Sequence, residues 1–182
     1  SNSASWGFAK PWTETPSSRS RLVNMIQLGR ALLEYDTPPV KVLFVYNCNP
    51  AVTVPDQQRV LKGLEREDLF TVVFEQVMTD TARYADVVLP NTTFLEGYDV
   101  ARAYGSFAMQ LGKPVIEPVG ESRSNADVFS ELMRRLDVAT DDDPNGELEE
   151  MLNVLSQLPD PIGEDLRTFG TARPPFNGHP IQ

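Results

Sequence analysis

The stretch from Val40 to Pro90 decides the fold. It opens with the apolar run VKVLFVYN (residues 40–47), which leads through the polar turn NCNP (residues 47–50) to the helix-like PDQQRVLKGLER (residues 55–66). A second apolar run, LFTVVFEQ (residues 69–76), precedes TDTARYADVVLP (residues 79–90). Apolar strands that alternate with helical segments are typical of a parallel sheet. This order predicts an α/β fold, a three-layer sandwich with a mostly parallel sheet.

Further elements are expected on both sides of this stretch. Apolar residues repeat at a helical period from about Ser20 to Pro38, and again after a Ser-Asn-Ala-Asp start at residues 124–127. A third helix is expected over residues 148–158, and PVIEP (residues 114–118) is expected to form a strand. Thr53 and Asp56 are expected to cap the helix that follows the first strand. Because nearly every residue of that strand is apolar, we expect it to be covered on both faces.

Three parts are expected along the chain. Residues 1–19 are an irregular lead-in, residues 20–158 form the α/β domain, and residues 159–182 form an extended tail in which Pro and Gly interrupt any period.

Composition excludes several classes of function. The 182 residues carry a net charge of −10, which argues against non-specific binding to nucleic acid. No apolar run approaches the roughly 18 residues that a membrane-spanning helix needs, and the first residues contain no secretory signal. One Cys and one His exclude an internal disulfide and a Cys-based zinc site. The default compartment is therefore the cytoplasm.

Polar side chains follow the first two predicted strands. Asn47, Cys48 and Asn49 lie just past the first strand, and Phe74-Glu75 ends the second. Ligands bind at the carboxyl ends of strands in open parallel sheets. An Asn amide both donates and accepts hydrogen bonds, and a carboxylate accepts two N–H groups from the Watson–Crick edge of guanine. An ordinary turn rich in Asn and Pro, and a surface Glu at a strand end, remain the alternatives.

Three other positions are candidate site residues. Asn125 lies at the start of a predicted helix, where backbone N–H groups accept anions. Glu96 and Glu117 would form an acid/base pair only if a cleft brought them together. The sequence contains no GxxxxGK[ST], GxGxxG, GxSxG, HExxH or CxxC motif.

Longer strings in the sequence resemble the catalytic subunits of the molybdopterin-dependent oxidoreductases, the group of dimethyl sulfoxide reductase, formate dehydrogenase and periplasmic nitrate reductase. The resemblance extends from about residue 20 to the end. It rests on VNMIQLGRALLE, VKVLFVYNCNPAVTVPDQQRV, TVVFEQVMTDTARYADVVLPNTTFLE, YGSFAMQLGKPVIEPVGESRSNADVFSELMRRL and RPPFNGHP. The most specific combination is ADVVLP followed closely by Glu, and then P-x-G-E-x-x-S-[ND].

The resemblance implies a Rossmann-like third domain that holds the guanine nucleotide arm of a molybdopterin guanine dinucleotide. By motif, Asn47, Cys48 and Asn49 would contact this arm, Phe74-Glu75 would read the guanine, and Asn125 would lie against the cofactor. Gly97 falls near a position where some relatives carry a cofactor-contacting lysine. The change to Gly puts that contact in doubt.

The resemblance also implies a longer parent enzyme of bacterial type, in which a bound metal ion, molybdenum with tungsten as the alternative, carries oxygen-atom or electron transfer. The metal ligand, any iron–sulfur cluster and a C-terminal barrel domain would belong to other regions, so this chain alone is expected to be inactive. Expected partners are the other domains and an electron-transfer subunit, and the separate fragment is expected to self-associate. The parent's compartment is either cytoplasmic or periplasmic. The alternative is a stand-alone nucleotide-binding or interaction module without redox activity.

Overall fold

The computed structural model describes residues 23–102 and 108–174. The chain divides into two compact units. We call Ser18–Asn91 the parallel-sheet unit and the part from Thr92 onward the C-terminal unit. The predicted domain over residues 20–158 includes parts of both units, and each unit is described by itself.

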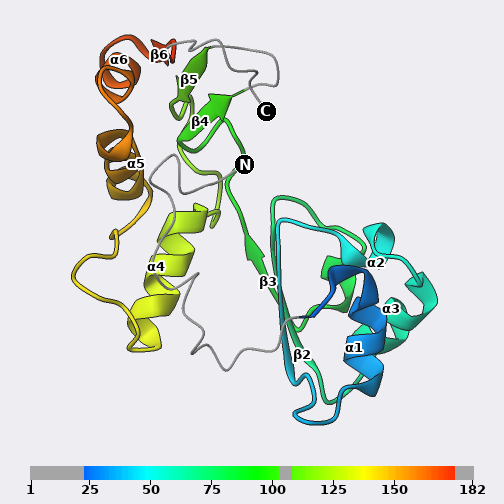
Figure 1. Cartoon of the computed structure of the whole chain (residues 1–182). Coiled ribbons are helices and arrows are strands. Elements are labelled where there is room, and N and C mark those ends of the chain that lie inside the picture. Colours follow the sequence, from blue (N-terminus) through cyan, green and yellow to red (C-terminus); the bar gives the residue numbers. More distant parts are fainter. Residues whose placement is uncertain (1–22, 103–107, 175–182) are drawn as a thin grey trace. The chain divides into compact units, whose positions relative to one another are not determined.

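The parallel-sheet unit contains a three-stranded sheet in the order β1-β2-β3, of which β2 and β3 are labelled in Figure 1. Its strands are β1 (Val42–Tyr46), β2 (Phe70–Glu75) and β3 (Val87–Pro90). Its helices are α1 (Leu28–Glu34), α2 (Pro50–Thr53) and α3 (Gln57–Leu64), with the 3-10 turns η3 (Met25–Gln27) and η4 (Thr81–Tyr84). Both neighbouring strand pairs are parallel. The prediction of an α/β fold with a parallel sheet is confirmed.

The helices of this unit pack against one face of the sheet. Leu43 of β1 contacts a buried cluster that joins the sheet to the helices and includes Leu32, Ala51, Val60 and Leu64. On the same face, Val45 and Val73 pack against Ala82 of η4. This unit on its own therefore provides two layers of the predicted sandwich.

The other face of the sheet is more exposed than the sequence suggested. Val42 at the start of β1 is 62% exposed, and its register partner Phe70 is 49% exposed. Within the parallel-sheet unit, the buried clusters that join β1 to helices use Leu43 and Val45, which point to one face only. Cover on the second face of β1 stays a prediction.

Two glycines allow α1 and α3 to lie close together. A Cβ added to Gly63 would lie 2.6 Å from the Cβ of Leu32, and one added to Gly29 would lie 2.7 Å from the Cβ of Arg59. Real Cβ atoms do not approach this closely, so the contact between the helices requires glycine at both positions. The packing of these helices holds the loop after β1, because α2 and α3 share a buried cluster with α1.

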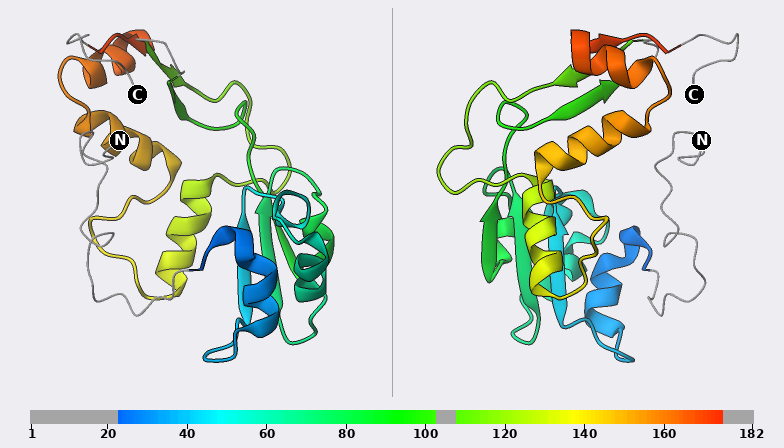
Figure 2. Two further views of the ribbon diagram at one scale, coloured as in Figure 1. Left: turned by 45° about the vertical axis from the view of Figure 1, so that its right-hand side comes forward. Right: turned by 90° about the vertical axis from the view of Figure 1, so that its left-hand side faces the viewer.

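The described part of the C-terminal unit contains an antiparallel sheet and three helices. Its strands are β4 (Asp99–Arg102), β5 (Met109–Gly112) and β6 (Thr171–Ala172), in the order β4-β5-β6. Its helices are α4 (Asn125–Arg135), α5 (Glu147–Gln157) and α6 (Ile162–Phe169). Both views of Figure 2 show α6 (orange-red) beside β6, and buried residues of α5, α6, β5 and β6 form one cluster: Met109, Leu155, Leu158, Ile162, Leu166 and Ala172.

Three local predictions differ from the structure. Residues 114–118 form no strand, and the strands of this region are β4 and β5. The part of the expected extended tail that the structure describes contains α6, because Ile162 and Leu166 lie one helical turn apart and pack into the core. Asp56 precedes α3 in a left-handed conformation without a side-chain cap bond, and Thr53 belongs to α2, so the expected cap at these two residues is not formed.

The predicted cap of α4 is confirmed, since the Asp127 N–H donates to the Ser124 Oγ over 3.2 Å.

Candidate functional site at the strand ends

Asn47 and Glu75 lie at neighbouring strand ends. Asn47 directly follows β1 with a φ of 47°, a left-handed conformation that Asn adopts more readily than most residues. Its backbone N–H donates to the carbonyl of Phe74 over 3.1 Å, and Glu75 is the last residue of β2. The structure therefore brings Asn47 and Glu75 together, as the general rule on strand ends predicts.

The amide of Asn47 is held by a residue from the end of β3. Asn91 Nδ2 donates to Asn47 Oδ1 over 2.8 Å, and the Asn91 backbone N–H donates to the carbonyl of Glu75 over 3.1 Å. Asn47 itself is exposed, and within the described residues its side chain makes no second hydrogen bond. Its NH2 group is therefore an available donor at the strand ends.

The carboxylate of Glu75, at the neighbouring strand end, provides acceptors. Glu75 is partly exposed, and its Oε1 accepts the backbone N–H of Gln76 over 2.8 Å. Each carboxylate oxygen has two lone pairs, so this bond leaves acceptor capacity on both oxygens. Asn47 and Glu75 thus offer a donor and an acceptor at adjacent strand ends.

Cys48 is exposed and lies between these groups and the start of α2. Partial burial raises the pKa of its thiol above the ordinary 9.0, and the negative charge of Glu75 also raises this pKa. A hydrogen bond with the Tyr46 backbone lowers it, but the net shift is upward. The thiol is therefore protonated at neutral pH, whereas a catalytic nucleophile needs the thiolate. This disfavours Cys48 as a nucleophile, and a contact of Cys48 with the cofactor stays a prediction.

Phe74 is fully buried, and its ring stacks on Tyr46 with centroids 5.9 Å apart and an interplanar angle of 21°. A ligand cannot reach this ring. Phe74 contributes to the site through its carbonyl, which accepts the Asn47 N–H.

Asn49 connects two loops of the protein. Its Oδ1 accepts from the backbone N–H of Thr81 over 3.1 Å and from the Thr81 hydroxyl over 2.7 Å, while its Nδ2 donates to Asp80 over 3.2 Å. Thr81 is fully buried, and its Oγ1 also accepts the N–H of Ala51 over 3.0 Å. The Asn49 amide is thus engaged by the protein at both ends, which favours a structural role over direct contact with a ligand.

The remaining two predicted site residues, Gly97 and Asn125, belong to the C-terminal unit. Gly97 is buried, and a Cβ on it would lie 2.7 Å from Oε1 of Glu147. Burial raises the pKa of Glu147, and the charges of Asp127 and Glu150 raise it further. Asn125 is the first residue of α4 and is not its cap, which is Ser124. Cofactor contacts at these two positions remain predictions.

The suggested acid/base pair of Glu96 and Glu117 has no support in the structure. Glu96 is buried, and its carboxylate accepts the N–H and hydroxyl of Thr93 and the N–H of Val119, at 2.7, 2.6 and 2.7 Å. These hydrogen bonds lower the pKa of Glu96, so it is a poor base. Glu117 is exposed.

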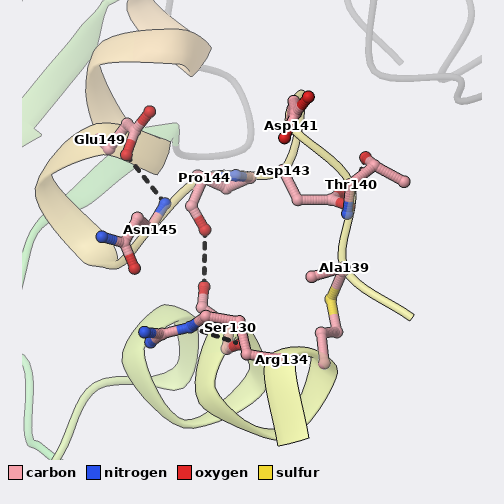
Figure 3. A pocket seen from close by; sticks show the side chains of 10 residues that line it. Ser130, Arg134, Ala139, Thr140, Asp141, Asp143, Pro144, Asn145 and Glu149 are labelled. Carbon is pink, nitrogen blue, oxygen red and sulfur yellow. Dashed lines mark hydrogen bonds between the residues drawn. The ribbon is translucent and has the colours of Figure 1, made fainter. Parts of the chain in front are cut away.

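A hollow of about 420 Å³ lies in the C-terminal unit between α4 and the segment before α5 (Figure 3). Its polar groups mostly bond to one another: Ser130 Oγ donates to the Pro144 carbonyl, and the Asn145 N–H donates to Glu149. Its lining includes Asp141, Asp143 and Glu149 against Arg134. This excess of negative charge disfavours a phosphate-bearing ligand.

Sequence reasoning missed Asn91 and Thr81 as parts of the strand-end site. Asn91 directly follows the third strand, so the rule applied to the first two strands would also have selected it. Thr81 carries no comparable signal. Among the described residues, no group of three or more His, Cys, Asp or Glu side chains is placed to hold a metal ion. None of the helices in the described part is long and apolar enough to cross a membrane.

Comparison with known proteins identifies the family. A family model described as molybdopterin oxidoreductase matches residues 23–135, which is more than half of the chain. The chain belongs to the molybdopterin oxidoreductase family. The matched region contains all seven predicted site residues, from Asn47 to Asn125.

Several members of the molybdopterin oxidoreductase family and a solved structure are similar to this chain. "Probable oxidoreductase YoaE" of Bacillus subtilis (strain 168) is 53% identical over 109 residues, 60% of this chain and 16% of that protein. Dimethyl sulfoxide/trimethylamine N-oxide reductase of Cereibacter sphaeroides is 38% identical over 142 residues, 73% of this chain and 17% of that protein. Acetylene hydratase from Pelobacter acetylenicus matches with a TM-score of 0.69 and 28% identity, covering 85% of this chain and 21% of that one. The chain thus spans about a fifth or less of the length of these relatives.

Proposed function

We propose that this chain is a cofactor-binding part of a larger molybdopterin enzyme, and that the ends of β1 and β2 hold the guanine nucleotide arm of a molybdopterin guanine dinucleotide. The observation that carries this proposal is the side-chain pair of Asn47 and Glu75. An available amide NH2 and a partly exposed carboxylate lie at adjacent strand ends, where open parallel sheets bind nucleotides.

The chemistry of this pair fits guanine better than adenine. The Watson–Crick edge of guanine presents two adjacent N–H groups, which one carboxylate accepts together. Adenine presents a single amino group beside a ring nitrogen acceptor, so it would face Glu75 with one donor and one repelled lone pair. The Asn47 NH2 would donate to an oxygen of the nucleotide, such as a phosphate or ribose oxygen. The site therefore suits a guanine nucleotide.

In the parent enzyme the cofactor would supply oxygen-atom or electron transfer at its molybdenum, and the protein would position it. The residues of this chain bind the cofactor and orient it. Glu75 accepts from the base, Asn47 donates, and Asn49 and Phe74 hold the loop and strand that carry them. The names of the relatives include a reductase and a hydratase, so the reaction of the parent depends on regions beyond this domain.

Titration of the 182-residue chain with GDP and with ADP, followed by calorimetry, tests the proposal. We expect GDP to bind more tightly than ADP. Glu75→Gln should weaken GDP binding by about 1.5–3 kcal/mol, because a charge-assisted hydrogen bond is lost and an amide NH2 meets the guanine N–H groups. Glu67→Gln removes the same charge from an exposed position that precedes β2 and should leave GDP binding unchanged. Equal binding of GDP and ADP, or equal effects of the two substitutions, would contradict the proposal.

A further inference from the structure

Asn91 contacts both members of the proposed nucleotide site while being almost completely buried. It is 4% exposed, its Nδ2 donates to Asn47 Oδ1 over 2.8 Å, and its backbone N–H donates to the Glu75 carbonyl over 3.1 Å. The end of β3 is therefore tied to the ends of β1 and β2. Because the buried Asn91 amide donates to Asn47, it influences which side of the Asn47 amide faces a ligand.

The bond from Asn91 selects one of two orientations of the Asn47 amide. An Asn side chain presents an acceptor oxygen on one side and an NH2 donor on the other. Because Asn91 donates to the oxygen of Asn47, the NH2 is the side that stays available. If the amide turned over, its oxygen would lie on the ligand side together with the Glu75 carboxylate. Two acceptor groups without a donor would repel the oxygens of a nucleotide.

We propose that Asn91 is a positioning residue that orients the Asn47 amide, so that a donor rather than an acceptor faces the nucleotide. The proposal rests on the function proposed above and adds a residue that does not touch the ligand. Asn91 fixes the orientation before binding, so the donor is already in place when the nucleotide arrives. Preorganisation of this kind increases affinity because less freedom is lost on binding.

The test compares two substitutions in the 182-residue chain, with GDP as the probe. Asn91→Asp replaces the donor with a group that only accepts, so the Asn47 NH2 should turn toward position 91. Asn91→Leu has a similar size and makes no hydrogen bond, so the Asn47 amide should rotate freely. The side-chain NH2 signals of Asn47, assigned by their loss in Asn47→Ala, report the orientation by NMR without any ligand.

We expect Asn91→Asp to shift the Asn47 NH2 signals in the free protein and to weaken GDP binding about tenfold, equivalent to about 1.4 kcal/mol. Asn91→Leu should weaken GDP binding less, since it permits both orientations. Gln76→Glu adds a negative charge next to Glu75 and controls for repulsion of the phosphates. It should leave the NH2 signals of free Asn47 unchanged and weaken GDP binding less than Asn91→Asp.

Three results would overturn the inference. One is an unchanged Asn47 NH2 signal and unchanged GDP affinity in a folded Asn91→Asp chain. Another is an equal loss of affinity in the Leu and Asp variants, which would indicate a purely structural role for Asn91. The third is a loss in Gln76→Glu as large as in Asn91→Asp, which would assign the effect to charge. Failure of the proposed function would give a different result. GDP would then shift no NMR signal of the unsubstituted chain, independently of whether Asn91→Asp changes the Asn47 NH2 signals in the absence of GDP.

Discussion

Replacement of Asn49 by Ala should destabilise the parallel-sheet unit. The substitution removes the acceptor of two donors on Thr81, the backbone N–H at 3.1 Å and the hydroxyl at 2.7 Å, and Thr81 is fully buried. A buried donor without an acceptor costs about 1–3 kcal/mol. Because the hydroxyl retains some freedom to reorient, we expect a total loss of about 2–4 kcal/mol.

Asn49→Asp is the matched variant. It keeps an acceptor oxygen for Thr81 but replaces the NH2 that donates to Asp80 over 3.2 Å with a second carboxylate. Because Asp80 is exposed, we take the bulk-water value for two charges about 4 Å apart, about 1 kcal/mol, as the cost of this repulsion, and the double variant Asn49→Asp/Asp80→Asn should recover most of it.

Amide hydrogen exchange of Val45 and Val73 is the suitable assay for the Asn49 variants. Both residues are in the core of the parallel-sheet unit, so their exchange reports the opening of that unit separately from the C-terminal unit. The expected order of stability is unsubstituted chain, Asn49→Asp, Asn49→Ala. The reasoning would be refuted if Asn49→Ala left exchange unchanged and weakened GDP binding, because Asn49 would then be a ligand donor.

Two further predictions concern packing and pH. Gly63→Ala should destabilise the chain, because the new Cβ would lie 2.6 Å from Leu32 Cβ. Overpacking costs about 1–3 kcal/mol, whereas the higher helix propensity of Ala contributes about 1 kcal/mol in the other direction. A variant that is more stable than the unsubstituted chain in thermal unfolding would contradict this prediction. The hydrogen bonds of the Glu96 carboxylate lower its pKa in the folded chain below the ordinary value of 4.5. The ionised carboxylate therefore contributes its full stabilisation above pH 4.5, and this stabilisation is lost as the pH falls through the lowered pKa. The stability difference between the unsubstituted chain and Glu96→Gln should therefore shrink in acid, and a difference independent of pH would oppose this assignment.

The sequence predicted the parallel-sheet unit better than the C-terminal unit. Strands β1, β2 and β3 are short apolar runs that end in polar residues, so both their positions and the neighbourhood of Asn47 and Glu75 were predictable. β4 and β5 are only four residues long, and β5 alternates at Met109, Gln110 and Leu111 over too short a stretch to stand out in the sequence. Helix α6 lies in a segment rich in Pro and Gly, although Gly170, in a left-handed conformation at the helix end, is a helix stop signal.

The assignment of Asn49 shows where sequence reasoning stops. Local pattern places Asn47 and Asn49 in the same polar turn, and both appear equally suited to a ligand. Their difference comes from side-chain partners far along the chain: Thr81 for Asn49, 32 residues away, and Asn91 for Asn47, 44 residues away. Spacing within a motif does not encode such contacts, so the structure was needed to separate the structural amide from the available one.

Alkylation of Cys48 by iodoacetamide tests the central claim, nucleotide binding at the ends of β1 and β2, most directly. Cys48 is the single cysteine of the chain, follows Asn47 directly and is exposed. Its thiol pKa is raised in part by the charge of Glu75, so Glu75→Gln should speed alkylation at neutral pH. We predict that GDP slows alkylation of the unsubstituted chain, that ADP at the same concentration does not, and that Glu75→Gln abolishes the protection. An alkylation rate that stays the same at saturating GDP, or that GDP and ADP reduce equally, would contradict the claim.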